Sequence, residues 1–556
     1  MHPVVILLIG VVIVVGGVLL FRLHAFLALV LGALAVGALT SSTVVRIYET
    51  EKRSTEIIQS TPFLGQWELF LDGSDFRATQ QLIVIRPEPG GFIELGTAFI
   101  SRIETVTLSD GAEVSQAIAL TRAVEIAPRA GDLVATRTDL SAASKIANMT
   151  VGERVAAAFG TTCGKIGILI AMAAIIGKCL LDSGAADKIV RSALKVVGER
   201  GAPVAFAGSG FLLGIPVFFD TVFYLMMPLG KAMRMRTKRN YLLYILTIVA
   251  GGSMAHSLVP PTPGPLLVSE ELGVDIGLMI LGGTLVGLCS SAAAFLYASF
   301  MNKRYEVPLR ESADFSLEDL ENLAQQDESS LPPLLLSLAP IVLPVIFIAG
   351  YTIIKSLNVD LGPDLMAVAA TLGNKNIALT IAAAIAMAML IWKRRTNLKD
   401  LAASVQSALS SGGVIILITA AGGAFGGVLQ QTGVATLIRD IPAGSYQVIL
   451  ILAFLITTAI RTAQGSATVA MITAVGVLGG FATGGLGCHP LYLALAIGCG
   501  SKPIAWMNDS GFWVINRMSG MTIRESIRSV SFLMTMMAID GLVAVMLLAW
   551  LFPMSG

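Results

Sequence analysis

The chain has 556 residues, of which 55% are hydrophobic and only 13% are charged. Soluble proteins carry about 25% charged residues, so this composition, with its long apolar runs, is that of a polytopic membrane protein. The formal net charge of +1 gives no reason to expect a nucleic-acid partner. The five cysteines are scattered without a CxxC pair, so we expect packed thiols, no metal site and no cofactor.

Two apolar stretches open the chain, Val4–Phe21 and Ala25–Val45. Each approaches the roughly 20 residues that a helix needs to cross a bilayer. No Lys or Arg precedes the first stretch, and no small-x-small cleavage site follows it, so a transmembrane helix is favoured over a signal peptide. Residues 1–45 are therefore predicted to form the first two transmembrane helices.

The character of the chain changes over residues 46–150, which hold 14 acidic and 10 basic residues. Hydrophobic and polar residues alternate over Gln81–Arg86 and Phe92–Ile103, and Pro/Gly turn signals separate these stretches. Period-two alternation between turns is typical of β-strands. We expect a small β-rich soluble domain inserted between the second and third helices, with no catalytic motif.

Apolar spans resume after residue 150 and are divided by a charged segment, residues 301–331, which is expected to be a cytoplasmic linker. The predicted spans are Val155–Leu181, Ala202–Gly230, Tyr241–Val259, Ile276–Phe300, Pro332–Ile354, Asn376–Trp392, Gly412–Leu429, Ser445–Ile460, Ser466–Ala482, Leu491–Met507 and Val530–Phe552.

Several of these spans contain Gly/Pro breaks and ionisable residues. Hydrocarbon penalises charges and unpaired backbone groups by several kcal/mol, so such features survive only where they line a cavity. In secondary transporters, interrupted helices form the transport site. We predict hairpins over residues 202–230 and 445–482, and broken helices over residues 241–265 and 491–513.

An internal repeat relates the two parts of the chain. The pattern over Gly177–Ile189 recurs over Gly426–Ile438, an offset of 249 residues, and two downstream breaks follow at nearly the same offset. With the basic loops placed in the cytoplasm and residues 202–230 forming a hairpin, the two halves have opposite orientations, and both termini and the 46–150 domain are predicted to lie outside. The alternative is that residues 202–230 cross the membrane once, which places that domain in the cytoplasm and leaves four basic residues outside. The predicted fold is an all-α membrane protein with about 10–12 spans in two inverted repeats, each with a re-entrant hairpin and a broken helix. The first repeat comprises residues 1–45 and 151–300, and the second comprises residues 332–556.

Long, ordered motifs recur through both halves, at residues 210–229, 256–265, 272–278, 372–379, 418–433, 461–476 and 508–513. In these segments the chain resembles the gluconate permease family (gluconate:proton symporters) of the ion-transporter superfamily. The resemblance implies proton-coupled uptake of gluconate or a related sugar acid across the bacterial inner membrane. Its implied partners are a small anionic substrate, protons and the lipid bilayer, and analogy with the superfamily suggests a homodimer. Lys502–Met507 depart from the gluconate-type pattern, so the exact substrate stays open.

A sugar-acid substrate needs an anion site and many partners for its hydroxyls. Half-helix N-termini offer free N–H groups and the positive end of the helix dipole. For Ser466 and Thr468, the alternative to substrate binding is that they cap helices or form hydrogen bonds between helices. For Arg461, the alternative is that its side chain extends to the membrane interface. The predicted substrate-binding residues are Thr262, Gly264, Arg461, Gln464, Gly465, Ser466, Thr468, Asn508 and Ser510.

Proton coupling needs a group that changes its protonation during the transport cycle, and Asp220, His256 and Asp509 are the predicted groups. Asp220 could instead form a fixed ion pair with Lys178 or Lys502, and His256 could be a hydrogen-bonded residue of a helix end. Two alternatives to a proton-coupled transporter remain. One is a sodium-coupled transporter, and the other is a transporter-like membrane sensor that uses the 46–150 domain. Enzyme motifs such as GxxxxGK[ST] are absent from the sequence, so an enzyme is not expected.

Overall fold

The computed structural model describes residues 2–63, 66–72, 76, 80–88, 90–107, 113–124, 126–310, 331–359, 361–394, 398–433, 446–479 and 486–554. The chain divides into two compact units. The first is drawn from residues 1–10, 33–157 and 427–437, and the second from residues 11–32, 158–426 and 438–556. Most of the predicted linker 301–331 and the end of the predicted hairpin 445–482 lie outside the described residues.

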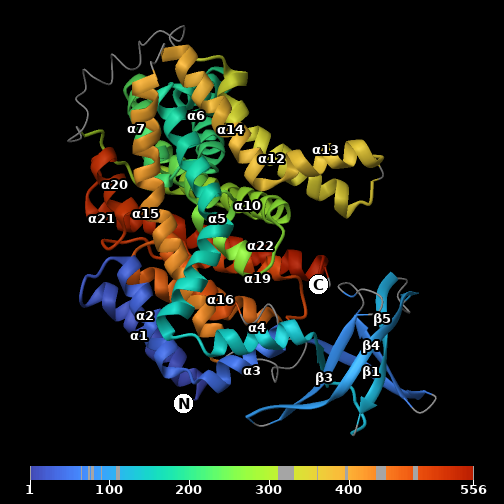
Figure 1. Cartoon of the computed structure of the whole chain (residues 1–556). Coiled ribbons are helices and arrows are strands. Elements are labelled where there is room, and N and C mark those ends of the chain that lie inside the picture. Colours follow the sequence, from blue (N-terminus) through green and yellow to red (C-terminus); the bar gives the residue numbers. More distant parts are fainter. Residues whose placement is uncertain are drawn as a thin grey trace. The chain divides into compact units, whose positions relative to one another are not determined.

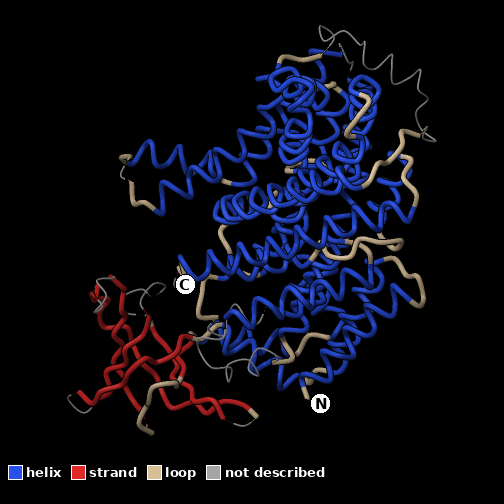
Figure 2. The backbone as a smooth tube through the Cα atoms, turned by 180° about the vertical axis from the view of Figure 1, so that it is seen from behind, coloured by secondary structure: helices blue, strands red, loops and turns tan. Residues whose placement is uncertain are grey.

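All the strands of the described residues belong to one closed antiparallel barrel in the first unit (Figure 2). The order around the barrel is β1-β2-β5-β4-β3-β6, so no strand is left as an unpaired edge. Alternate residues of the strands, such as Leu82 and Val84, point into a continuous apolar core. The strands are β1 (Thr55–Phe63), β2 (Gln66–Asp72), β3 (Gln81–Glu88), β4 (Gly91–Thr107), β5 (Glu113–Val124) and β6 (Leu133–Ala135). The prediction of a small β-rich domain is thereby confirmed.

A buried polar network accompanies the barrel in the first unit. Gln431 donates from Nε2 to Glu49 Oε1 (3.0 Å) and accepts from Arg154 Nη1 (3.1 Å). Arg154 also donates from Nη2 to the carbonyl oxygen of Gly37 (2.9 Å). Since Glu49, Arg154 and Gln431 are all buried, these bonds replace water for three polar side chains. The network joins α3 (Ser42–Lys52), which leads into the barrel, to Gln431, the residue that follows α15 (Leu398–Gln430).

Helices make up the rest of the described chain (Figure 1). They are α1 (Pro3–Leu19), α2 (Ala25–Leu39), α4 (Arg137–Ala147), α5 (Val151–Asp182), α6 (Ala185–Gly214), α7 (Phe219–Thr237), α8 (Tyr241–Leu258), α9 (Pro263–Glu271), α10 (Ile276–Arg304), α12 (Leu334–Ser356), α13 (Pro363–Gly373), α14 (Lys375–Arg394), α15 (Leu398–Gln430), α16 (Tyr446–Gln464), α17 (Ala467–Leu478), α19 (Pro490–Gly500), α20 (Ser510–Ser519), α21 (Ile523–Ser526) and, after a π-helical turn at Ile527–Ser531, α22 (Phe532–Leu551).

Eight spans of the described residues are long and apolar enough to cross a membrane, and the bent pair α2–α3 raises the number to nine. Reaching the predicted 10–12 spans would require the shorter apolar helices, which include α17 and α19. The span at α8 and α9 is buried over its whole apolar window and forms the centre of the second unit, where α8 packs against α6, α7, α10 and α19. Gly251 of α8 allows close contact with α6, because a Cβ there would collide with the carbonyl oxygen of Ala207.

Two helix breaks occur in the first half of the chain where Pro interrupts it. Between α6 and α7, Phe218 is extended and begins the next helix two residues after Pro216. Between α8 and α9, Val259 is extended (φ −112°, ψ 116°), as expected for a residue before a proline, and Pro263 restarts the helix at its first position. Both breaks lie in the ranges predicted for a hairpin and a broken helix.

Two further breaks occur in the second half. Gly465 follows α16 with φ +81°, a left-handed conformation that favours glycine, and Ser466 then caps α17 by accepting from Val469 N (3.3 Å). Residues 501–509 separate α19 from α20, and Asp509 caps α20. A transport site at these positions requires interrupted helices, and the structure shows an interruption at each of them.

Some predicted boundaries were wrong. The second span, expected to reach Val45, ends at Leu39, and the chain bends by 101° into α3. The β-rich domain predicted over residues 46–150 also contains helical residues, because α3 and α4 flank the barrel. Residues 187–199, which lie outside every predicted span, and the first arm of the hairpin predicted over residues 202–230 form one element, α6, kinked at Gly198 (φ +67°). The helix α13 was not predicted, because its 11 residues are too few to give a span signal.

Candidate functional site

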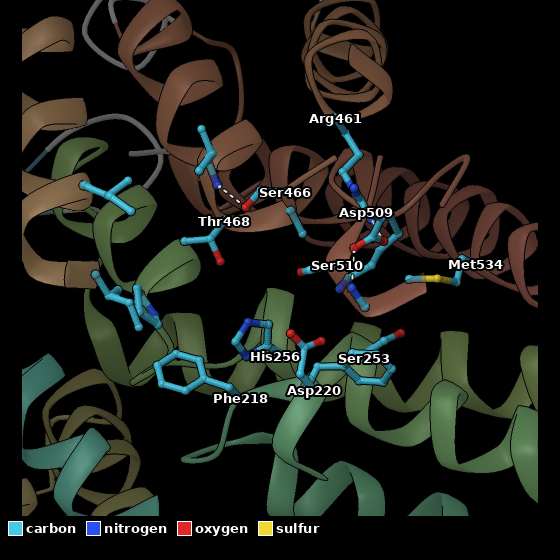
Figure 3. A pocket seen from close by; sticks show the side chains of 18 of the residues that line it. Phe218, Asp220, Ser253, His256, Arg461, Ser466, Thr468, Asp509, Ser510 and Met534 are labelled. Atoms are coloured by element: carbon cyan, nitrogen blue, oxygen red, sulfur yellow. Dashed lines mark hydrogen bonds and ion pairs between the residues drawn. The ribbon is translucent and has the colours of Figure 1, made fainter. Parts of the chain in front are cut away.

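A cavity of about 320 Å³ lies inside the second unit. It falls at the lower end of the range of small-molecule pockets, about 300–1,000 Å³. Its walls come from both halves of the chain: α7, α8 and α9 on one side, and α15, α17, α20 and α22 on the other. Figure 3 shows Phe218, Asp220, Ser253 and His256 facing Ser466, Thr468 and the segment that carries Asp509. Of the predicted site residues, seven line this cavity: Asp220, His256, Arg461, Ser466, Thr468, Asp509 and Ser510.

A buried ion pair joins the ends of two broken segments at the cavity wall. Arg461 Nη2 binds the carboxylate of Asp509, and Arg461 Nε donates to the carbonyl oxygen of Ser501 (3.0 Å). The second carboxylate oxygen of Asp509 accepts from Gly511 N (2.8 Å) at the start of α20. Because Arg461 is only 2% exposed, it does not extend to the membrane interface. Arg461 therefore connects the end of α16 to the break between α19 and α20.

Several buried polar atoms around the cavity have no hydrogen-bond partner within the described part of the chain. They include Ser253 Oγ, His256 Nδ1 and Arg461 Nη1. Such atoms are rare in folded proteins because an unpaired buried donor or acceptor costs roughly 1–3 kcal/mol. The ring of His256 is held edge-on to Phe218, with centroids 5.8 Å apart. The side chains that carry these atoms line the cavity, so a hydroxylated ligand there would lie beside unsatisfied polar groups.

Asp220 enters the cavity from the first turn of α7. The pairing with Lys178 that the sequence left open is not observed, since Lys178 Nζ binds Asp182 one turn along its own helix (2.9 Å). Asp220 is close enough to Asp509, Lys502 and Arg461 for electrostatic interaction. No ion pair to its carboxylate is found among the residues that the structure describes.

Five predicted site residues do not line the cavity. Thr262 Oγ1 donates to the carbonyl oxygen of Val259 (2.8 Å) and closes the break between α8 and α9. Gly264 packs against Met471, where a Cβ would collide with that side chain. Both residues therefore shape the wall without facing the cavity.

The other three lie at the end of α16. Asn508 Nδ2 donates to the carbonyl oxygens of Thr462 (2.7 Å) and Ala463 (3.1 Å), which the helix leaves without partners. A Cβ at position 465 would collide with the backbone of Asn508, so the two segments can approach this closely only because residue 465 is glycine. The side-chain amide of Gln464 is buried and unpartnered within the described residues, and Gln464 does not line the cavity.

Sequence reasoning missed several residues of the cavity. Ser253 lies three residues before His256 on α8, a spacing that places both on one helix face and could have revealed it. Thr419 of α15 and Met534 of α22 carry no such signal, since nothing local brings them to the cavity. Lys502 was considered as a partner of Asp220 and as a departure from the gluconate-type pattern, but not as a site residue, yet it lines the cavity itself. No cluster of three or more His, Cys, Asp or Glu side chains suited to a metal ion occurs in the described ranges.

An apolar helical bundle whose interrupted segments line a cavity with several ionisable and polar side chains is the architecture of a membrane transport protein. The family comparison agrees. The chain matches the GntP family permease over residues 133–551, and it belongs to that family. It is therefore a permease and not an enzyme, and a multi-pass protein of the bacterial inner membrane. The matched region begins at the last barrel strand, so the first five strands lie outside it.

Individual relatives are similar over most of their length. An uncharacterized permease of Haemophilus influenzae is 34% identical, covering 65% of this chain and 75% of that protein. The gluconate permease of Pseudomonas aeruginosa is 31% identical, covering 70% and 86%. The high-affinity gluconate transporter of Escherichia coli is 29% identical, covering 72% and 89%. The crystal structure of the Alcanivorax borkumensis YdaH transporter shares the fold, with a TM-score of 0.52 at 14% identity over 72% of this chain and 89% of that one.

Proposed function

We propose that the protein carries gluconate or a related sugar acid into the cell, coupled to protons. The observation that supports this most directly is the cavity, where unpartnered polar atoms and cationic side chains gather between segments of both halves. A polyhydroxy carboxylate matches that lining, because it presents one anionic group and several hydroxyls. The named relatives at about 30% identity, gluconate permeases and transporters, support the same substrate class.

Asp220 is the proposed coupling residue. It faces the cavity with a carboxylate that no described cation neutralises in an ion pair, whereas Asp509 is bound to Arg461. Protonation of Asp220 removes a negative charge from the space that an anionic substrate occupies, so proton binding and substrate binding favour each other. His256, on the same side of the cavity, is proposed to assist by exchanging hydrogen bonds with the substrate.

The test is uptake of labelled gluconate by the purified protein in liposomes. An inward proton gradient should drive accumulation, and an inward sodium gradient alone should not. Accumulation driven only by sodium would overturn proton coupling, and no uptake under either gradient would overturn the substrate. Asp220→Asn should lose gradient-driven accumulation while retaining gluconate exchange. The matched control is Asp364→Asn, an exposed aspartate in the first turn of α13, which should behave as wild type.

We further propose that the two halves are inverted repeats, with hairpins at residues 202–230 and 445–482, and that the barrel lies outside the cytoplasm. The basic residues gathered at the C-terminal ends of α7 and α14 support this orientation through the positive-inside rule. Glu88→Cys, at the exposed end of β3 in a cysteine-free background, should react with an impermeant thiol reagent in intact spheroplasts. Protection of that cysteine would reverse the orientation.

The barrel can be removed to separate transport from sensing. Thr55 of β1 pairs with Val134 of β6, so the two ends of the barrel are adjacent and a short linker can replace residues 55–135. A transporter should retain gluconate uptake after this deletion. Complete loss of uptake in a protein that still folds would favour the alternative of a membrane sensor.

A further inference from the structure

Lys502 is a buried charge that neither the fold nor the proposed coupling accounts for. It is 3% exposed and lines the cavity. Within the described ranges, its ammonium group takes part in no ion pair or hydrogen bond, although buried ammonium groups normally have such partners. A partner that is not part of the chain would complete this arrangement.

The backbone around Lys502 is held in place on several sides. Lys502 N donates to the carbonyl oxygen of Cys499 (3.1 Å) at the end of α19. The preceding residue, Ser501, accepts a bond from Arg461 Nε (3.0 Å) and bonds through Oγ to Ser257 Oγ (3.2 Å). Pro503 follows and restricts the backbone further. The ammonium group is therefore directed to the cavity by a fixed backbone and does not reach the lipid surface.

The charge balance of the cavity makes Lys502 the cation that is available to a ligand. Arg461 is also cationic, but its charge is matched by the Asp509 carboxylate it binds. Asp220 is the remaining carboxylate of the cavity lining, and it interacts electrostatically with Lys502. When Asp220 is ionised the four charges cancel, and when Asp220 holds a proton the cavity carries one net positive charge. The titratable groups that act on Lys502 are Arg461, Asp509, Asp220, Cys499 and His256.

We propose that Lys502 binds the carboxylate of the substrate, and that the negative charge of Asp220 opposes the substrate at this position. Protonation of Asp220 removes that charge from the cavity, so one proton enters with one carboxylate and the loaded cavity stays neutral. This assignment rests on the proposed function, because it names the residue that recognises the anion in that site. It also predicts a preference for monoanions, since a second carboxylate would find no unmatched cation in the described lining.

The test measures ligand-induced thermal stabilisation of the purified full-length protein. Gluconate and a panel of small hydroxy-monocarboxylates are compared with their uncharged amides. The carboxylates should stabilise the wild type and the amides should not. Lys502→Gln should need about 10- to 150-fold more carboxylate, as expected for loss of a charge-assisted bond, and Lys502→Arg should restore part of the affinity. Lys178→Gln, which breaks a partly exposed ion pair on α5, is the matched control and should bind as wild type.

A pH series adds a readout that a purely structural role would not change. Carboxylate affinity should rise as the pH falls in the wild type, and should be high and independent of pH in Asp220→Asn. Wild-type affinity in Lys502→Gln would overturn the inference, as would a wild type that no carboxylate stabilises. If gluconate fails but another monocarboxylate binds through Lys502, the sugar acid proposed above is wrong while the role of Lys502 stands.

Discussion

Replacement of Arg461 by Gln is expected to destabilise the protein strongly. The change removes the cation that neutralises Asp509, and both side chains are nearly inaccessible to water, with 2% and 12% of their surfaces exposed. Breaking a buried pair by removing one partner costs about 3–5 kcal/mol, which lowers the ratio of folded to unfolded protein by about 150- to 5,000-fold. The double variant Arg461→Gln/Asp509→Asn should recover much of this loss. It leaves no unpaired charge at these two positions, and Asn can still cap α20.

The assay is equilibrium unfolding of the full chain by SDS in mixed micelles. Arg236→Gln is the matched control, because Arg236 pairs with Glu199 at the surface, where both side chains are about half exposed or more, and should cost at most about 1 kcal/mol. If Arg461→Gln is no more destabilising than Arg236→Gln, the argument from burial is wrong. If the double variant is as unstable as the single one, the unpaired carboxylate is not the cause.

Three further outcomes follow from packing and hydrogen bonding. Gly251→Ala should lower the free energy of unfolding by about 1–3 kcal/mol in the same SDS titration, because the new methyl group collides with the backbone of α6. Its control is Gly208→Ala, which should be neutral or slightly stabilising because a Cβ at that position meets nothing within 4 Å. Gln431→Leu removes the two buried hydrogen bonds that Gln431 forms with Glu49 and Arg154, so hydrogen exchange of the backbone amides of α3 should become about 5- to 150-fold faster. Unchanged exchange would show that these bonds do not stabilise α3. Replacement of Gly465 by Ala should disrupt the end of α16 and lower gluconate uptake, because the left-handed backbone and the adjacent Asn508 both exclude a Cβ; wild-type uptake would show that this fit is not needed.

The elements of this protein were largely predictable because their signals are local. Runs of apolar residues long enough to cross a bilayer marked the spans, and alternation over Gln81–Arg86 marked β3. Pro260 and Pro261 predicted the end of α8, since proline disfavours helix in the residue before it. Boundaries without such a signal were misplaced, as at Leu39, where the chain bends within an apolar run.

Only some of the residues that line the cavity could be predicted from the sequence. Arg461 and Asp509 were found because a charge beside a helix break is costly unless it has a role. Asn508 is an uncharged polar residue at the same break and was predicted as a partner for substrate hydroxyls, yet its amide binds the carbonyl end of α16 instead of facing the cavity. Lys502, six residues earlier, faces the cavity with its ammonium group unmatched by any described residue.

The sequence by itself determined that the chain is a membrane transport protein with interrupted helices and an inserted β domain. Tertiary structure alone decided which polar groups meet, because α8, α15 and α22 are separated by more than a hundred residues and converge only through packing. A break in a helix depends on neighbouring residues, so the sequence records it locally. The orientation of a side chain at such a break depends on the segments packed around it, which are distant in the sequence. No pattern in the neighbouring residues indicates which segments these are.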